Sequence, residues 1–182
     1  QSLTYVLDIF LKKLDPEKDI VNYFTYIAFF PQLVAGPIER ATSLLPQFRR
    51  LHQVTLENLF SGIKLIIVGL FLKVFIADNI GGIVDTIFAN YQDYRSGTLL
   101  LGGLGFSIQI YGDFCGYSLI AIGVAKIMDF NLMQNFKTPY FSNSLQEFWS
   151  RWHISLSTFL NDYIFLPLAL MFRRKGLIGI ES

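Results

Sequence analysis

Two long apolar stretches, residues 56–77 and 98–128, constrain the fold of this chain more than any other feature. A membrane-spanning helix needs about 20 predominantly apolar residues, and each stretch meets that length. Only 16% of the 182 residues are charged, against about 25% in an ordinary soluble domain. Because so little charge cannot cover a water-facing globule that also buries both stretches, we expect an all-α, polytopic membrane protein.

A third apolar region, residues 20–38, is interrupted by Pro31, Gly36 and Pro37. Proline removes a backbone donor and interrupts a helix. Residues 29–37 are therefore expected to form a broken or re-entrant segment. Irregular backbone is tolerated at membrane depth only where protein or a water-filled cavity satisfies its polar groups.

The glycine-rich stretch 98–128 would be about 46 Å long as one helix, longer than the roughly 30 Å hydrocarbon core. We therefore expect a break near Gly112 and Asp113, giving a span and a second, tilted helix. The basic segment 39–52 precedes the span 56–77, and the acidic segment 78–96 follows it. The positive-inside rule then places the first loop in the cytoplasm and the second outside.

A polar connection, residues 129–143, leads to a predicted amphipathic helix. Ser144 followed by Glu147 resembles a capping box at its start. Aromatic and aliphatic side chains recur at helical spacing along residues 148–163, and polar side chains form the opposite stripe. One amphipathic helix of this kind either lies along the membrane interface or lines a polar cavity. Pro167 is expected to break the apolar run that follows.

His153, on the polar stripe one turn before Ser157, is the main candidate for chemistry. Histidine is the side chain best suited to act as a general base near neutral pH. The alternative is a structural histidine that is hydrogen-bonded between helices. By contrast, we expect His52 to be a solvated residue of a basic loop, and Cys115 to be a small packed residue.

Three further charged residues are candidates for supporting roles. Asp113 lies inside an apolar stretch, where a charge is costly and usually faces a bundle interior. It either orients a histidine or binds the acceptor, or it forms an ion pair with Lys64, Lys126 or Arg151. Arg151 and Asp162 stand three helical turns apart on the predicted helix, and they either pair with neighbours or bind an anionic donor.

Other classes of function have little support. A net charge of +1 does not favour nucleic acid. With one cysteine there is no disulfide framework and no cysteine-cluster zinc site, and no motif indicates a bound metal or organic cofactor. The chain begins with Gln and ends shortly after a basic run, which we interpret as an internal fragment of a longer protein.

Three motifs, in order along nearly the whole chain, resemble the membrane-bound O-acyltransferase (MBOAT) family, and in particular its bacterial branch. The first is Phe-Phe-Pro-Gln-Leu-Val-Ala-Gly-Pro-Ile-Glu-Arg at 29–40, and the second is Gln-Ile-Tyr-Gly-Asp-Phe-Cys-Gly-Tyr-Ser at 109–118. The third and most specific is Phe-Trp-Ser-Arg-Trp-His-Ile-Ser-Leu-Ser at 148–157, preceded by Asn-Phe at 135–136.

This resemblance implies one MBOAT-type membrane domain over residues 1–182, incomplete at both ends, with a tunnel that donor and acceptor reach from opposite sides. It implies two functional histidines. His153 matches the first. The second, which the family resemblance implies is the catalytic one, belongs to a Trp-His-Gly motif that is expected downstream of this fragment. Asp113 and Arg151 are motif neighbours of weaker standing, and Ser157 and Asp162 are supporting candidates.

The activity implied is transfer of an acyl group, acetyl above all, from acetyl-CoA or another thioester to a hydroxyl of an envelope or exported polysaccharide such as alginate. The implied partners are the bilayer of the inner or plasma membrane, crossed several times, and a polysaccharide acceptor or an acyl-relay protein. Two alternatives are a transporter or scaffold subunit without catalysis, and D-alanyl transfer to teichoic acid.

Overall fold

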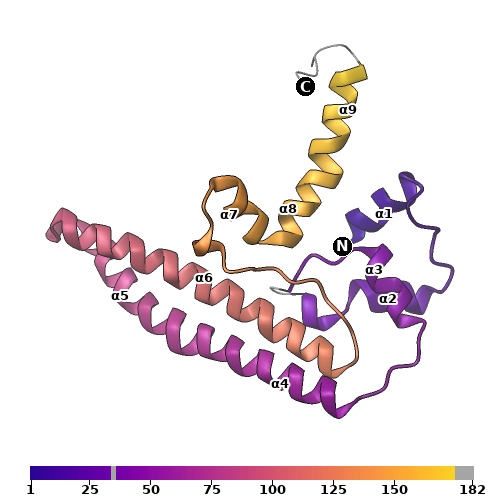
Figure 1. Ribbon diagram of the computed structural model, residues 1–182, viewed down its shortest axis with the longest axis horizontal. Helices are drawn as coiled ribbons and strands as arrows, with labels where there is room; N and C mark the ends of the chain where they lie inside the picture. Colours follow the sequence, from indigo (N-terminus) through magenta and orange to yellow (C-terminus); the bar gives the residue numbers. More distant parts are fainter. Residues whose placement is uncertain (34–35, 175–182) are drawn as a thin grey trace. The chain divides into compact units, whose positions relative to one another are not determined.

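The computed structural model of the protein describes residues 1–33 and 36–174, the last of these by its backbone alone. Every regular element within those ranges is helical, as expected for an all-α protein (Figure 1). The chain forms two compact units. The hairpin unit comprises residues 29–36 and 50–132, and the three-segment unit comprises residues 1–28, 37–49 and 133–182. The expectation of a single domain stays a prediction.

The hairpin unit is built from two long antiparallel helical runs (Figure 1). The first run is continuous from Leu56 to Ala89 and consists of α4 (Leu56–Leu70), a π-helical turn (Phe71–Ala77) and α5 (Asp78–Ala89). The second is α6 (Ser96–Ile127). The Thr55 hydroxyl starts the first run by accepting a hydrogen bond from the Asn58 N–H at 3.1 Å.

Glycines bring α4 and α6 together at backbone distance. A Cβ added to Gly69 would lie 2.6 Å from the carbonyl oxygen of Gly116, and one added to Gly123 would lie 2.6 Å from that of Gly62. Small residues at membrane helix interfaces permit such close approach. The glycine pattern of residues 98–128 therefore serves helix packing, and it fixes the register of the hairpin.

Two predictions for this unit are wrong. Residues 78–89 were expected in an outer loop, but they are helical, and Asp78 at the start of α5 is paired with Lys73 at 2.6 Å. The break expected near Gly112 and Asp113 is absent, and α6 runs unbroken for 32 residues. Gly112 lets the neighbouring run approach, since a Cβ there would lie 3.0 Å from the Leu72 carbonyl oxygen. A helix longer than the hydrocarbon core is accommodated by tilting or by extending beyond it.

The three-segment unit gathers elements from both ends of the chain around buried side chains of Tyr5, Tyr26, Leu44 and Leu45. Its elements are α1 (Ser2–Phe10), α2 (Ile20–Ile27), α3 (Ala41–Phe48), a 3-10 turn (Pro139–Phe141), α7 (Leu145–Arg151), α8 (Ile154–Leu160), a π-helical turn (Asn161–Phe165) and α9 (Leu166–Arg174). The segment 39–52, expected as a polar loop, thus contains a helix with a buried apolar face.

The expected broken segment is irregular wherever it is described. Phe30–Gln32 form one 3-10 turn that contains Pro31, and Phe29 is buried against Phe130 with ring centroids 4.8 Å apart. Residues 34 and 35 of this prediction lie outside the described residues.

The single amphipathic helix expected over 144–163 is also wrong, because α7 ends at Arg151 and α8 begins at Ile154. Ser144 does cap α7, accepting a hydrogen bond from the Glu147 N–H at 3.1 Å. The Glu147 carboxylate completes the cap on the Asn143 N–H. Pro167, expected as a break, lies inside α9, directly after the π-helical turn.

Three helical runs in the described part of the chain are long and apolar enough to cross a membrane: Leu56–Ala89, Ser96–Ile127 and Ile154–Arg173. The last begins directly after His153, so this histidine lies at the end of a candidate span. The protein is a membrane protein by this measure.

Candidate active site

The backbone at His153 takes the left-handed conformation, with φ 42° and ψ 56°. This conformation costs most L-residues roughly 1–2 kcal/mol, although histidine is among the residues that enter it more readily. His153 is the junction between α7 and α8, and the turn there breaks the helical run that the sequence pattern suggested. Strained backbone persists where its surroundings hold it, and it is often found at functional sites.

The preceding connection holds this junction from both sides. The Lys137 N–H donates to the Arg151 carbonyl at 2.9 Å, and the Ile154 N–H donates to the Asn135 carbonyl at 2.9 Å. The Asn135 Oδ1 atom also accepts from the Ser155 hydroxyl at 2.8 Å and from the Ser155 N–H at 3.3 Å. The chain is therefore fixed immediately before and immediately after His153.

Aromatic packing anchors the residue before the histidine. The Trp152 ring stacks on Phe148 at 5.6 Å between centroids and meets the edge of the buried Phe136 at 5.2 Å. Tyr140 lies 6.1 Å from Trp152 by the same measure. The aromatic stripe of the sequence therefore forms a local core under the junction.

His153 is half-buried, and this burial lowers the pKa of its imidazole. Burial disfavours the charged form, so the ring stays neutral to lower pH than an exposed histidine. A neutral imidazole has a lone pair that can accept a proton from a hydroxyl. The direction of this pKa shift favours the neutral form of His153.

Ser157, the supporting candidate one turn later, is engaged in holding the junction. Its N–H donates to the His153 carbonyl at 3.0 Å, and its hydroxyl donates to the carbonyls of Trp149 at 3.1 Å and Trp152 at 3.3 Å. It therefore ties α8 back to α7.

Arg151 and Asp162 do not share a helix face, because the helix that would align them is broken at His153. The Arg151 guanidinium donates to Glu147, four residues earlier on α7. The Asp162 carboxylate pairs with Arg40 at 2.7 Å, and it belongs to the π-helical turn. Pairing with neighbours was one of the two roles considered for both residues.

A polar cluster beside Asp162 was not predicted from the sequence. The Arg40 guanidinium lies 4.9 Å from the Tyr163 ring centroid, and the Tyr163 hydroxyl donates to the buried Asp8 carboxylate at 2.5 Å. These contacts join residues 155 positions apart in the chain. Two members carried a signal in the sequence: Arg40 ends the first family-like motif, and Asp162 was a supporting candidate.

In the hairpin unit, Asp113 is bound to Lys73, whose ammonium lies 2.7 Å from its Oδ1 and 2.6 Å from the Asp78 carboxylate. An ion pair was one of the expected alternatives, but the partners suggested, Lys64, Lys126 and Arg151, were wrong. Lys73 also lies over the Tyr117 ring, 5.4 Å from its centroid. The functional roles considered for Asp113 stay predictions.

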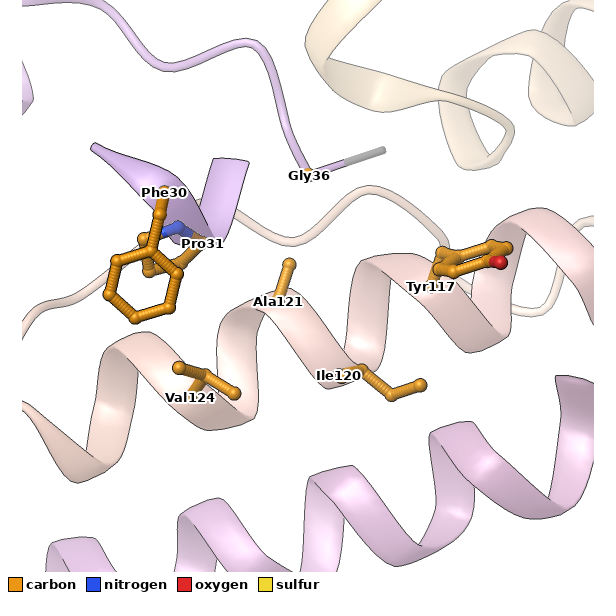
Figure 2. A pocket seen from close by; sticks show the side chains of 7 residues that line it. All are labelled: Phe30, Pro31, Gly36, Tyr117, Ile120, Ala121 and Val124. Atoms are coloured by element: carbon orange, nitrogen blue, oxygen red, sulfur yellow. The ribbon is translucent and has the colours of Figure 1, made fainter. Parts of the chain in front are cut away.

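An apolar cavity of about 290 Å³ lies in the same unit, between the broken segment and α6. Figure 2 shows Phe30 and Pro31 above Val124 at one end and Tyr117 at the other. Among the described residues, no three His, Cys, Asp or Glu side chains gather as a metal ion would need.

His52 is not the solvated residue that was expected. Its ring stacks on Phe130 at 4.1 Å, its Nδ1 atom lies 3.5 Å from the Asp129 carboxylate, and 24% of its side chain is exposed. A left-handed turn at Asp129, φ 63°, follows the end of α6. It brings Asp129 and Phe130 to the loop that precedes α4. Cys115 is buried, as expected for a packed residue.

The chain is similar to proteins of one membrane family. Residues 12–178 match the membrane-bound O-acyltransferase family, MBOAT. A probable alginate O-acetylase of Pseudomonas putida is 41% identical over 97% of this chain and 36% of its own length. A peptidoglycan O-acetyltransferase of Helicobacter pylori is 38% identical over 81% of the chain and 28% of its own length.

A teichoic acid D-alanyltransferase of Bacillus subtilis is 33% identical over 82% of the chain and 38% of its own length. The chain thus spans about a third of the length of the curated relatives it matches. Since the family match covers all but the ends of the sequence, the chain belongs to the membrane-bound O-acyltransferase family.

Proposed function

We propose that the whole protein is an O-acyltransferase that moves an acyl group, acetyl in particular, from a thioester donor such as acetyl-CoA to a hydroxyl of an envelope or exported polysaccharide. The observation that carries this proposal is 40–41% identity to probable alginate O-acetylases over 92–97% of the chain. The peptidoglycan relative is also named for O-acetyl transfer. The alginate and peptidoglycan relatives are thus named for the same reaction, O-acetyl transfer, and differ in the glycan that accepts the acetyl group.

His153 accepts or relays the proton of the acceptor hydroxyl in this proposal. The hydroxyl oxygen attacks the thioester carbonyl, a new ester C–O bond forms and the C–S bond breaks. The departing thiolate takes up the proton that the hydroxyl lost, so the histidine returns to its neutral form. The other candidates have supporting roles: they hold helices and substrates in place and do not take part in bond making or breaking. These residues are Asp113, Arg151, Ser157 and Asp162.

The setting follows from the same proposal. The protein crosses the inner or plasma membrane several times, and its partners are the lipid bilayer and a polysaccharide acceptor or an acyl-relay protein of the envelope. Neither nucleic acid nor a bound metal has a part in it.

D-Alanyl transfer to teichoic acid is the second candidate, supported by relatives of 33% and 27% identity that bear that name. The reaction is also ester formation on a hydroxyl, so His153 has the same part in it. The lower identity makes it the weaker candidate.

The test uses the full-length protein in its own membrane and the variant His153→Ala. We expect the variant to lose most of the alkali-labile acetate released from purified envelope polysaccharide, because the proton of the hydroxyl has no acceptor. Free D-alanine released by the same treatment identifies the second candidate. His52→Gln is the matched control, since His52 lies in the other unit, and it should retain ester formation.

An unchanged ester content in His153→Ala, with the protein present in the membrane at the normal amount, would exclude the role given to this residue. A protein that carries a glycan across liposomes without adding an ester would instead be a transporter.

The pH dependence gives a further check. Because burial lowers the pKa of His153 from its ordinary 6.5, the neutral form persists below that value. Initial rates of ester formation should therefore fall, as the pH is lowered, with a midpoint below 6.5. A midpoint above that value would show that His153 is stabilised in its charged form.

A further inference from the structure

The first turn of α8 is capped by a residue from elsewhere in the chain. A helix leaves its first N–H groups without partners inside the helix, and the N-cap side chain usually accepts one of them. His153 occupies the N-cap position of α8, but its side chain forms no capping hydrogen bond. The N–H groups of Ile154 and Ser155 donate instead to the carbonyl and the side-chain oxygen of Asn135.

Both partners of this remote cap are fully buried. Asn135 and Ser155 each have 1% of their surface exposed. Water cannot replace the Asn135 oxygen there, so its removal would leave a buried N–H and a buried hydroxyl unsatisfied. The left-handed turn at His153 therefore depends on a side chain 18 positions earlier in the sequence.

We propose that Asn135 is a positioning residue that caps α8 from a distance and so holds the His153 imidazole in its half-buried place. The importance of this role rests on the proposed function, whereas its test does not. The cap also takes over the task that an N-cap side chain ordinarily performs, which leaves the identity of residue 153 to be set by chemistry.

An amide suits this role better than a carboxylate. Both groups accept hydrogen bonds from the Ser155 N–H and hydroxyl, but a carboxylate adds a buried negative charge at Ser155, two positions after His153. A nearby negative charge favours the charged form of histidine. The charged or titratable groups on the elements packed around the junction are Lys137, Tyr140, Glu147, Arg151, Asp162 and Tyr163. Of these, Glu147 is paired with Arg151, Asp162 with Arg40, and Tyr163 donates to Asp8.

The test measures the histidine itself in the full-length protein in detergent. Diethyl pyrocarbonate acylates neutral imidazole, and mass spectrometry of the peptide that carries His153 gives the rate of modification at each pH. In the wild type the rate reports both access to the ring and its protonation. No acyl donor or acceptor is needed.

Three variants separate positioning from folding. Asn135→Ala should raise the plateau rate at high pH several-fold, because the ring loses its fixed place. Asn135→Asp keeps the acceptor, so the plateau should stay near the wild-type value while the midpoint moves to higher pH. Ser155→Ala loses the hydroxyl donor and keeps the N–H donor, so its plateau should lie between those of the wild type and Asn135→Ala.

Asn143→Ala is the matched control, because Asn143 belongs to the same connection and its side chain is exposed. It should match the wild type in both plateau and midpoint. If Asn135→Ala does not fold, the other two variants decide. A wild-type midpoint in Asn135→Asp together with a wild-type plateau in Ser155→Ala would overturn the proposal. If the modification behaves as expected but no ester is formed in any assay, the proposed function fails and the positioning role stands.

Discussion

The two units of this chain solve the same problem, holding helices together in an apolar surrounding, in opposite ways. In the hairpin unit the backbones of α4 and α6 touch at glycines, as at Gly69 and Gly116. In the three-segment unit the junction at His153 is held by side-chain and backbone hydrogen bonds from an irregular connection. The first arrangement fixes a scaffold, and the second fixes one residue in an unusual conformation.

Both units place a charged contact at a π-helical turn. Lys73 lies in the turn Phe71–Ala77 and binds Asp78 and Asp113, and Asp162 lies in the turn Asn161–Phe165 and binds Arg40. Such turns occur frequently at functional sites. In each unit, one ion pair that joins different elements has a partner in a π-helical turn.

The largest expected effect comes from filling the glycine contact of the hairpin. In Gly69→Val, the new Cβ would lie 2.6 Å from the Gly116 carbonyl oxygen, so the helices must separate along their length. We expect a loss of about 3 kcal/mol or more, seen as little folded protein in detergent. Gly103→Ala is the control, since nothing lies within 4 Å of a Cβ there, and it should gain up to about 1 kcal/mol. Equal thermal stability of the two variants would refute the backbone contact.

The sequence predicted the two long helices of the hairpin but not the partner of Asp113. Apolar length alone identifies residues 56–77 and 98–128 as helices. The pairing of Asp113 with Lys73 depends on the register between them, which is set by glycine contacts such as that between Gly69 and Gly116. A local pattern contains no information about that register.

Helix breaks were predicted at glycine and proline residues, but the break that forms the candidate site lies at His153. Gly112 and Pro167 lie inside helices, whereas α7 ends before His153 without either residue. Helical spacing continues across the junction in the sequence. The turn is held by Asn135, a residue that spacing within 148–163 could not reveal. His153 was chosen as a candidate for its chemistry, whereas the helical pattern around it was misinterpreted.

The second expected effect tests the charge in the hairpin. Lys73→Met leaves two carboxylates without their cation, and we expect a loss of about 2 kcal/mol, less than a fully buried pair would give because Asp113 and Asp78 are about half exposed. Adding Asp113→Asn to Lys73→Met should restore part of the loss. Thermal unfolding of the four proteins of this double-mutant cycle measures the coupling. Strictly additive losses would mean that the ion pair contributes nothing.

The smallest expected effect separates the backbone of His153 from its chemistry. Glycine enters the left-handed region without steric cost, whereas alanine carries the penalty of a Cβ there. We therefore expect His153→Gly to be more stable than His153→Ala by about 1 kcal/mol, measured by thermal unfolding in the same detergent. Both variants lack the imidazole, so both should lose ester formation alike. Stability and activity would then be set independently at residue 153. The cap from Asn135 would set the backbone conformation, and the imidazole of His153 would set the reaction. If the alanine variant proved as stable as the glycine variant, the turn at residue 153 would not be left-handed in solution, and the contrast drawn between the two units would fail at its most specific point.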